Sequence, residues 1–240
     1  MKSSTATSTL PSPTSSKVGT KTVVLLSGGM DSTTLLHWVR RYRSKEVYPI
    51  SFLYGQKHTK EVILARKTCD RLGLYLKIVV CDELGDLAPS SLTRSNIDIP
   101  EGHYEAESMK LTVVPNRNMT LLALATAYAI GIGAGEVAYA AHSGDHAIYP
   151  DCRPEFVTAM REAMRLCHDQ EIRLVAPFLY ASKADILKKG LILGVDYSLT
   201  WSCYKGGEKA CGKCGTCVER LEAFKKIGVE DPIEYEEEVK

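Results

Sequence analysis

The stretch "VVLLSGGMDSTTLLHWVR", Val23 to Arg40, decides the fold of this chain. Its first four residues are all apolar and predict a short strand that is buried on both faces. Beyond the Ser-Gly-Gly break, Thr34, Leu35, Trp38 and Val39 recur at the spacing of a helix. The stretch therefore predicts a strand, a glycine-containing turn and a helix, which together form one unit of an α/β sheet.

The turn between this strand and this helix is suited to an anion. Gly28 and Gly29 let the backbone approach a ligand closely, and the first turn of a helix offers unpaired N–H groups and the positive end of its dipole. Capping of the helix by Ser27, Asp31 or Ser32 is the alternative. Two hydroxyl residues, two glycines and an acid exceed what a cap requires, so the pattern favours phosphate binding. The turn matches neither a Walker loop, which needs a lysine, nor GxGxxG.

The rest of the chain alternates between strand and helix patterns. Such alternation predicts right-handed βαβ units and a Rossmann-like, doubly wound parallel sheet. Residues 82–113 carry few periodic apolar side chains and predict a long loop over the active-site edge of this sheet. The expected strands are 47–54, 74–80, 136–141 and 172–176, and the expected helices are 59–73, 118–133, 154–167 and 183–193.

Length and composition limit the class of protein. The 240 residues are 45% apolar with a net charge of +1, which suits one globular domain with a small appendage and argues against a nucleic-acid partner. Residues 1–20 are rich in Ser, Thr and Pro and predict a disordered tail without a signal peptide. No apolar stretch is long enough to span a membrane. We therefore expect a cytoplasmic protein with its main domain at 21–196 and a cysteine-rich segment at 197–240.

Four cysteines in that last segment follow the pattern C-x7-C-x2-C-x2-C: Cys203, Cys211, Cys214 and Cys217. Four thiolates with short spacers can surround a tetrahedral ion, as in structural zinc sites. Unliganded thiols would oxidise readily, and the usual bacterial iron–sulfur spacing differs from this one. The pattern therefore favours zinc, held by four protein ligands in a structural role with no open position for chemistry.

Polar residues follow two other predicted elements at the edge where ligands bind in such sheets. Tyr54, Gln56 and His58 come directly after the second strand, where an ordinary polar loop is the alternative to a substrate site. Asn118 is placed to cap the next helix, and Arg117 is free to reach an anion, with a plain surface arginine as the alternative.

The segment "HSGDHAIYPDCR" follows the fourth strand and returns to the same edge. Asp145, Asp151 and Arg153 supply acceptors and a donor suited to a guanine-like base and to a carboxylate. Cys152 invites comparison with a nucleophile, but no histidine pairing is visible, so we assign it to packing or binding. We expect His142 to lie in the same substrate site.

The loop "SGGMDST" resembles the SGGxDS pyrophosphate loop of the N-type ATP pyrophosphatases. This resemblance implies that ATP is cleaved between its α and β phosphates, with an adenylate left on the substrate. It also implies that Asp31 faces a Mg²⁺ ion and takes part in catalysis. The ATP-binding residues that it implies are Leu26, Ser27, Gly28, Gly29, Asp31, Ser32 and Thr33.

The ordered set "SGGMDST", "YGQKH", "SSLTR", "PNRN", "YPDCR" and the four cysteines resembles the 7-cyano-7-deazaguanine synthase family across nearly all of residues 21–240. The resemblance implies a homodimeric ligase with a Rossmann-like domain and a zinc-bearing C-terminal segment. It implies conversion of 7-carboxy-7-deazaguanine, ATP and ammonia to the 7-cyano compound, a queuosine and archaeosine precursor, through an adenylate and an amide. We expect Arg117, His142, Asp145 and Arg153 around the reacting oxygen, because all four lie on segments that should reach the same end of the sheet; Arg117 and Arg153 would assist catalysis there, and His142 and Asp145 would contact the substrate.

The chain departs from this family in residues 142–148 and at Asn116, where glycine is usual. The pyrophosphate loop is intact, so adenylation is expected. The endpoint stays open between the nitrile and 7-amido-7-deazaguanine. Two further alternatives are a tRNA-modifying or other amide-forming pyrophosphatase, which the neutral charge disfavours, and a zinc-stabilised nucleotide sensor without turnover.

Overall fold

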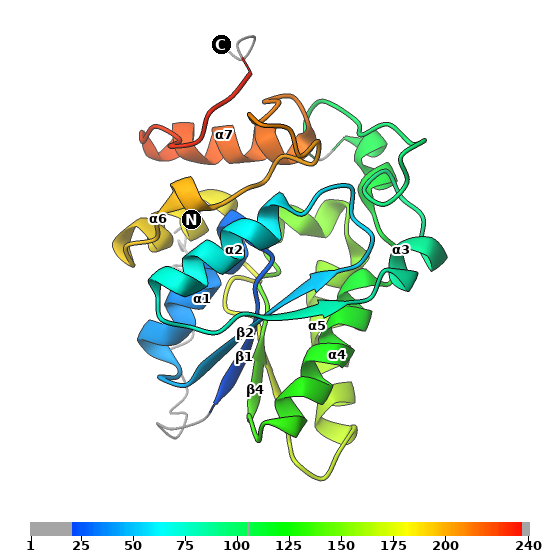
Figure 1. Cartoon of the computed structure of the whole chain (residues 1–240), viewed down its shortest axis with the longest axis vertical. Helices are drawn as coiled ribbons and strands as arrows, with labels where there is room; N and C mark the ends of the chain where they lie inside the picture. Colours follow the sequence, from blue (N-terminus) through cyan, green and yellow to red (C-terminus); the bar gives the residue numbers. More distant parts are fainter. Residues whose placement is uncertain (1–20, 105, 237–240) are drawn as a thin grey trace, which may run out of the picture.

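A computed structural model describes residues 21–104 and 106–236, and the tail expected at 1–20 lies outside these ranges. Five parallel strands form one sheet in the order β3-β2-β1-β4-β5 (Figure 1). The chain moves outward from β1 to β3 and then crosses to β4, so the order reverses beside β1. The predicted doubly wound sheet is confirmed. The strands are β1 Thr22–Leu25, β2 Val47–Leu53, β3 Lys77–Val80, β4 Glu136–Ala138 and β5 Arg173–Val175.

Strand β1 is the centre of the sheet. Thr22 is the register partner of Val47 on β2 and of Glu136 on β4. Val23 and Val24 are both fully buried, one on each face of the sheet. The loop that follows β1 is therefore held at the switch point, where open α/β sheets bind their ligands.

Helices cover both faces of the sheet. The core cluster that contains Val24 includes side chains of α1 (Met30–Tyr42), α2 (Lys60–Arg71) and α6 (Lys183–Ile192). The cluster that contains Val23 includes side chains of α4 (Arg117–Gly131) and α5 (Pro154–Leu166). In Figure 1, α1 and α2 lie on one side of the strands, and α4 and α5 lie on the other.

The structure differs from the sequence prediction at the element ends and in the long loop. Strand β4 ends at Ala138, three residues before the expected end, because the chain then turns into the ligand-binding edge. The segment expected as a loop at 82–113 is mostly irregular but contains a short helix, α3 (Glu83–Leu87), and a 3-10 helix, η1 (Glu107–Thr112).

The C-terminal segment packs on the main domain through α7 (Gly215–Ile227), which lies above α6 in Figure 1. Phe224 of α7 belongs to the same apolar cluster as Met30 and Leu187. Arg220 is completely buried, and its guanidinium donates to both carboxylate oxygens of Asp231 over 2.7 and 2.9 Å. Among the described residues, no helix combines the length and the apolar character that a membrane span requires.

Candidate active site

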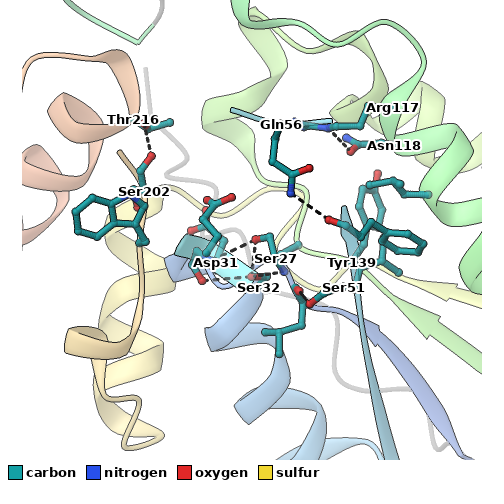
Figure 2. A pocket seen from close by; sticks show the side chains of 18 of the residues that line it. Ser27, Asp31, Ser32, Ser51, Gln56, Arg117, Asn118, Tyr139, Ser202 and Thr216 are labelled. Carbon is teal, nitrogen blue, oxygen red and sulfur yellow. Dashed lines mark hydrogen bonds between the residues drawn. The ribbon is translucent and has the colours of Figure 1, made fainter. Parts of the chain in front are cut away.

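The hydroxyls of the loop after β1 organise the loop itself. Ser32 Oγ lies 2.9 Å from Ser27 Oγ and accepts from the backbone N–H groups of Ser27 and Gly28 over 3.2 and 3.3 Å (Figure 2). Helix α1 has Gly29 as its N-cap, with no side-chain capping bond. The alternative that these side chains only cap the helix is therefore wrong, and the first turn of α1 keeps its N–H groups for a ligand.

Gly28 has a packing role in addition to the approach to a ligand that the sequence predicts. Its φ of +100° lies in the region that favours glycine, and a Cβ there would come within 2.0 Å of the Glu61 carbonyl oxygen on α2. On the other side, the backbone N–H of Trp201 donates to the Gly28 carbonyl over 3.0 Å. Close approach at Gly28 therefore serves packing of the loop between α2 and the C-terminal segment.

A buried cluster of charges lies next to the loop. Lys183, the first residue of α6, places its Nζ 2.6 Å from Asp31 Oδ2 and 3.1 Å from Glu219 Oε2. Burial acts to raise the pKa of Asp31, but Lys183 and His142 outweigh it and hold that pKa below its usual range. Asp31 Oδ1 is buried and has no hydrogen-bond partner, so it is available to a cation.

His142 connects this cluster with Asp145. Its Nδ1 accepts from the Gly144 N–H over 3.1 Å, and its Nε2 lies 3.5 Å from both Asp31 Oδ2 and Asp145 Oδ2. The imidazole is 1% exposed and does not line the cavity. The expected contact of His142 with substrate is therefore corrected, because the ring is behind the two carboxylates and orients them.

A cavity of about 270 Å³ opens between α2, α4, the C-terminal segment and the loop after β1 (residues 26–29), which we call the phosphate loop. In Figure 2 the loop forms its floor, with Ser202 and Thr216 on one side and Arg117 and Asn118 on the other. The expected site residues that line it are Leu26, Ser27, Gly29, Asp31, Ser32, Tyr54, Gln56, His58, Arg117, Asn118 and Asp145. Those that do not line it are Gly28, Thr33, His142, Asp151 and Arg153.

Arg153 and Asp151 lie outside the cavity for different reasons. Arg153 is exposed, and its Nε donates to the His146 carbonyl over 2.8 Å, so the structure does not place it at the reacting centre. Asp151 accepts the Asn118 backbone N–H through Oδ2 over 3.0 Å. It fixes the start of α4 and acts on the site from outside the cavity, through Asn118 and through the effect of its charge on Arg117.

Asn118 is the second residue of α4, so its expected role as a cap is wrong. The N-cap is Asn116, at a left-handed φ of 61°. Glycine and asparagine tolerate this conformation best, so the replacement of glycine by Asn116 leaves the turn intact. The Asn118 side-chain amide instead donates to Cys152 Sγ over 3.2 Å, which accounts for the buried thiol as a packing and bonding partner.

Arg117 turns inward. Its Nε donates to Asn118 Oδ1 over 3.3 Å, and its guanidinium lies 5.9 Å from the centre of the Tyr149 ring. Although burial acts to lower it, the pKa of Arg117 stays well above its usual value because Tyr54 and Asp151 favour the charged form. A fixed positive charge thus lines the cavity, and the alternative of a plain surface arginine is wrong.

Tyrosine hydroxyls form a polar wall that the sequence did not predict. Tyr104 Oη donates to Asp145 Oδ1 over 2.8 Å. Tyr149 Oη lies 3.0 Å from Tyr204 Oη and 2.6 Å from Thr112 Oγ1. Tyr104 and Tyr204 line the cavity, so this wall offers hydroxyls and a carboxylate to one polar ligand.

Sequence reasoning also missed Glu61, Lys183 and Trp201, which all line the cavity. Lys183 follows β5, and this position after a strand was the only signal that placed it at the ligand edge. Glu61 resembles any acid in the first turn of an amphipathic helix. Burial raises the pKa of Glu61 to about 7, while Arg117 acts in the opposite direction.

The four C-terminal cysteines converge as predicted. Cys203, Cys211, Cys214 and Cys217 are buried, and their sulfurs all lie within 4.8 Å of one another. A tetrahedral ion with bonds of about 2.3 Å requires sulfurs roughly 3.8 Å apart. The Cys214 N–H donates to Cys211 Sγ over 3.3 Å and the Cys211 N–H to Cys203 Sγ over 3.4 Å, which suits thiolates. The cluster can therefore hold a metal ion.

The segment that carries these cysteines also forms one wall of the cavity. Trp201, Ser202, Tyr204 and Thr216 line it and alternate with the cysteines along the chain. Thr216 Oγ1 donates to the Ser202 carbonyl over 2.7 Å (Figure 2), and the Lys60 ammonium lies 3.4 Å above the Trp201 ring. The cysteine cluster and the cavity are thus built from one segment.

This geometry defines a class: doubly wound α/β proteins with an anion-binding loop at the switch point, here combined with four cysteines placed to hold a metal. Within it, the chain belongs to the family described as queuosine biosynthesis protein QueC, whose model matches residues 21–228. It is similar to proteins named 7-cyano-7-deazaguanine synthase. The relative from Caldicellulosiruptor saccharolyticus is 63% identical over 91% of this chain and 97% of its own length.

Two further relatives with the same name show the breadth of the likeness. The protein from Methanoregula boonei is 62% identical, over 90% of this chain and 99% of its own length. The protein from Pseudoalteromonas atlantica is 54% identical, over 90% of this chain and 99% of its own length. The family expected from the six motifs is confirmed.

Proposed function

We propose that this protein is an ATP-dependent ligase that converts 7-carboxy-7-deazaguanine and ammonia to 7-cyano-7-deazaguanine. The names of its relatives support the reaction. The observation that carries the proposal is one cavity with an anion-binding loop on its floor and a polar wall of Asn118, Asp145 and Tyr104 beside it. Such a cavity can bring an ATP phosphate next to the carboxylate of a purine-like acid.

The floor of the cavity binds the pyrophosphate part of ATP. The free N–H groups at the start of α1 and the Ser27 and Ser32 hydroxyls supply donors, and Lys183 supplies a positive charge. The buried, unpartnered Asp31 Oδ1 is an oxygen ligand that suits Mg²⁺. When bound, this ion balances the charge of the pyrophosphate.

The opposite wall binds the deazapurine acid. A guanine-like edge presents N–H donors, and Asp145, held by Tyr104, offers carboxylate oxygens to them. Arg117 offers a fixed guanidinium to the 7-carboxylate. These contacts direct the carboxylate towards the phosphate loop, which lowers the entropic cost of the first step.

Two rounds of activation follow. A carboxylate oxygen attacks the α-phosphorus, pyrophosphate departs, and ammonia displaces AMP from the adenylate to give the amide. In the second round the amide oxygen attacks the α-phosphorus of a second ATP, and loss of AMP with two protons leaves the nitrile. The amide oxygen is the weaker nucleophile, so the second round depends more on precise positioning by Arg117 and Lys183.

The cysteine cluster holds zinc in this proposal. Cys203, Cys211, Cys214 and Cys217 occupy all four tetrahedral positions, so the ion has a structural role. We also propose that the enzyme is cytoplasmic and that it acts as a homodimer. Analytical ultracentrifugation of the purified chain tests the homodimer. A single sedimenting species of monomer mass would overturn that part.

Mass spectrometry of a time course with 7-carboxy-7-deazaguanine, Mg·ATP and ammonium tests the reaction. The expected result is a nitrile product with two AMP released per substrate and transient amide. One AMP and a stable amide would make the protein an enzyme that stops at 7-amido-7-deazaguanine. ATP binding without release of AMP would make it a nucleotide sensor instead.

A further inference from the structure

Glu61 is an acidic side chain of the cavity to which the two rounds of activation assign no role. Glu61 lies in the first turn of α2, and its backbone carbonyl packs directly against Gly28 of the phosphate loop. Its Oε1 lies 3.9 Å from the position that a Cβ on Gly29 would occupy. The carboxyl group is therefore fixed beside the phosphate loop, on the cavity side.

The groups that face Glu61 come from the other wall of the cavity. Arg117 of α4 acts on it electrostatically, as does Tyr54 at the end of β2. Within the described residues, no hydrogen bond or ion pair engages its carboxylate, in contrast to Asp31 and Glu219, which both pair with Lys183. Glu61 thus lies beside the phosphate loop, in the same cavity as Arg117 and within its electrostatic reach, where the function proposed above puts the activated acyl carbon.

We propose that Glu61 is a catalytic residue that takes a proton from the ammonium ion at the amide-forming step. This inference rests on the function proposed above. It assigns the ammonia subsite to the space between Glu61 and the phosphate loop. An unpaired carboxylate attracts the ammonium cation there, and removal of a proton exposes the nitrogen lone pair beside the acyl adenylate.

Two protons leave the nitrogen during the amide-forming step. Ammonium gives one proton to the Glu61 carboxylate, and the resulting ammonia forms the new C–N bond at the acyl carbon. The C–O bond to AMP breaks, and its electron pair stays on the phosphate oxygen. That oxygen takes the second proton from nitrogen, so the products are the neutral amide, AMP as its monoanion and protonated Glu61, which returns its proton to solvent.

The proton affinity of Glu61 suits this role. Burial in the cavity raises its pKa to about 7, despite the opposing charge of Arg117. A general base is most effective when its pKa lies near the working pH. Because Glu61 is protonated below this pKa, use of ammonium should decline as the pH falls through about 7.

The test compares Glu61→Gln with wild type and with Glu83→Gln, an exposed acid on α3. Pyrophosphate exchange into ATP, with 7-carboxy-7-deazaguanine and no ammonium, reports adenylation alone. Amide formation at pH 7.5 reports capture of ammonia. Hydroxylamine, which is neutral at this pH and needs no prior deprotonation, serves as a second nucleophile and gives the hydroxamate.

Glu61→Gln should retain exchange and form the hydroxamate, while its kcat/KM for total ammonium at pH 7.5 falls by about 10²-fold. The loss should shrink as the pH rises towards 9.5, where free ammonia replaces ammonium, and Glu83→Gln should behave as wild type. Loss of exchange together with amide formation, or unchanged use of ammonium, would overturn the inference. Absence of exchange in the wild-type protein would instead refute the function proposed above.

Discussion

Lys183 Nζ lies 2.6 Å from Asp31 Oδ2 in a largely buried position, so the phosphate loop and α6 are joined by one ion pair. Breaking a buried pair by removing one partner costs about 3–5 kcal/mol, because the other charge stays buried. Lys183→Met should therefore reduce the free energy of unfolding by this order and also abolish pyrophosphate exchange. Lys188→Met, an exposed change on the same helix, is the control for denaturant titrations.

The same pair predicts the pH range of stability. The folded pKa of Asp31 lies below its ordinary 3.8, so its contribution is present above pH 3.8 and is lost as pH falls through the folded value. The folded pKa of Lys183 lies above its ordinary 10.5, so its contribution is present below pH 10.5 and is lost at still higher pH. Circular dichroism should show Lys183→Met unfolding at less acidic pH than wild type. Coincident acid transitions would contradict this.

The two loop glycines should respond differently to alanine. Gly28→Ala forces a Cβ onto the Glu61 carbonyl at positive φ, which should cost about 1–3 kcal/mol and weaken ATP binding. At Gly29 the added Cβ meets its nearest neighbours at 3.5 Å, which is an ordinary contact. Gly29→Ala should therefore keep its melting temperature, and its only loss should be a lower affinity for nucleotide. Thermal melts and calorimetric titration with Mg·ATP separate the two, and equal melting points would contradict the argument.

Removal of one metal ligand should change the cavity wall. Cys214→Ser should lower zinc content, measured by elemental analysis, and shift the emission of Trp201 in a Trp38→Phe background. The shift is expected because the Trp201 indole N–H donates to the Cys203 carbonyl over 2.9 Å. Cys167→Ser, an exposed thiol outside the cluster, is the matched control. Full zinc retention in Cys214→Ser would sink the metal assignment.

The tyrosine wall predicts a change confined to the acid substrate. Tyr204→Phe removes the hydroxyl that lies 3.0 Å from Tyr149 Oη, and loss of one hydrogen bond costs about 0.5–1.5 kcal/mol. The KM for 7-carboxy-7-deazaguanine should rise about two- to tenfold at an unchanged KM for ATP. Steady-state kinetics with each substrate varied in turn checks this. A rise confined to the KM for ATP would place Tyr204 at the ATP end of the cavity instead.

The order of strands and helices followed from the sequence because hydrophobic periodicity is local. The strand-turn-helix unit at Val23–Arg40 and the alternation after it specify a parallel sheet, and the spacing of the cysteines specifies their convergence. Expected strand ends were less accurate. Residues 139–141 continue the apolar pattern of β4 beyond its end and line the cavity, although the Tyr139 N–H still donates to the Val175 carbonyl over 3.0 Å.

Side-chain direction within the site was not predictable in the same way. Arg153 has the composition of a binding residue, yet its guanidinium turns to the His146 carbonyl and stays exposed. Lys183 and Glu61 resemble ordinary charged residues at helix starts, and only the tertiary structure brings them to the loop after β1. A sequence places such residues at an edge of the sheet, but packing decides which of them face the cavity.

The hydrogen bond from the backbone N–H of Trp201 to the Gly28 carbonyl forms late in the synthesis of the protein. The phosphate loop is among the first parts of the described chain to leave the ribosome, whereas Trp201 and the cysteine segment are among the last. Until they emerge, the loop lacks one of its two supporting neighbours and the cavity lacks a wall. We therefore expect a ribosome-bound nascent chain truncated before Trp201 to bind Mg·ATP far more weakly than the chain of 240 residues.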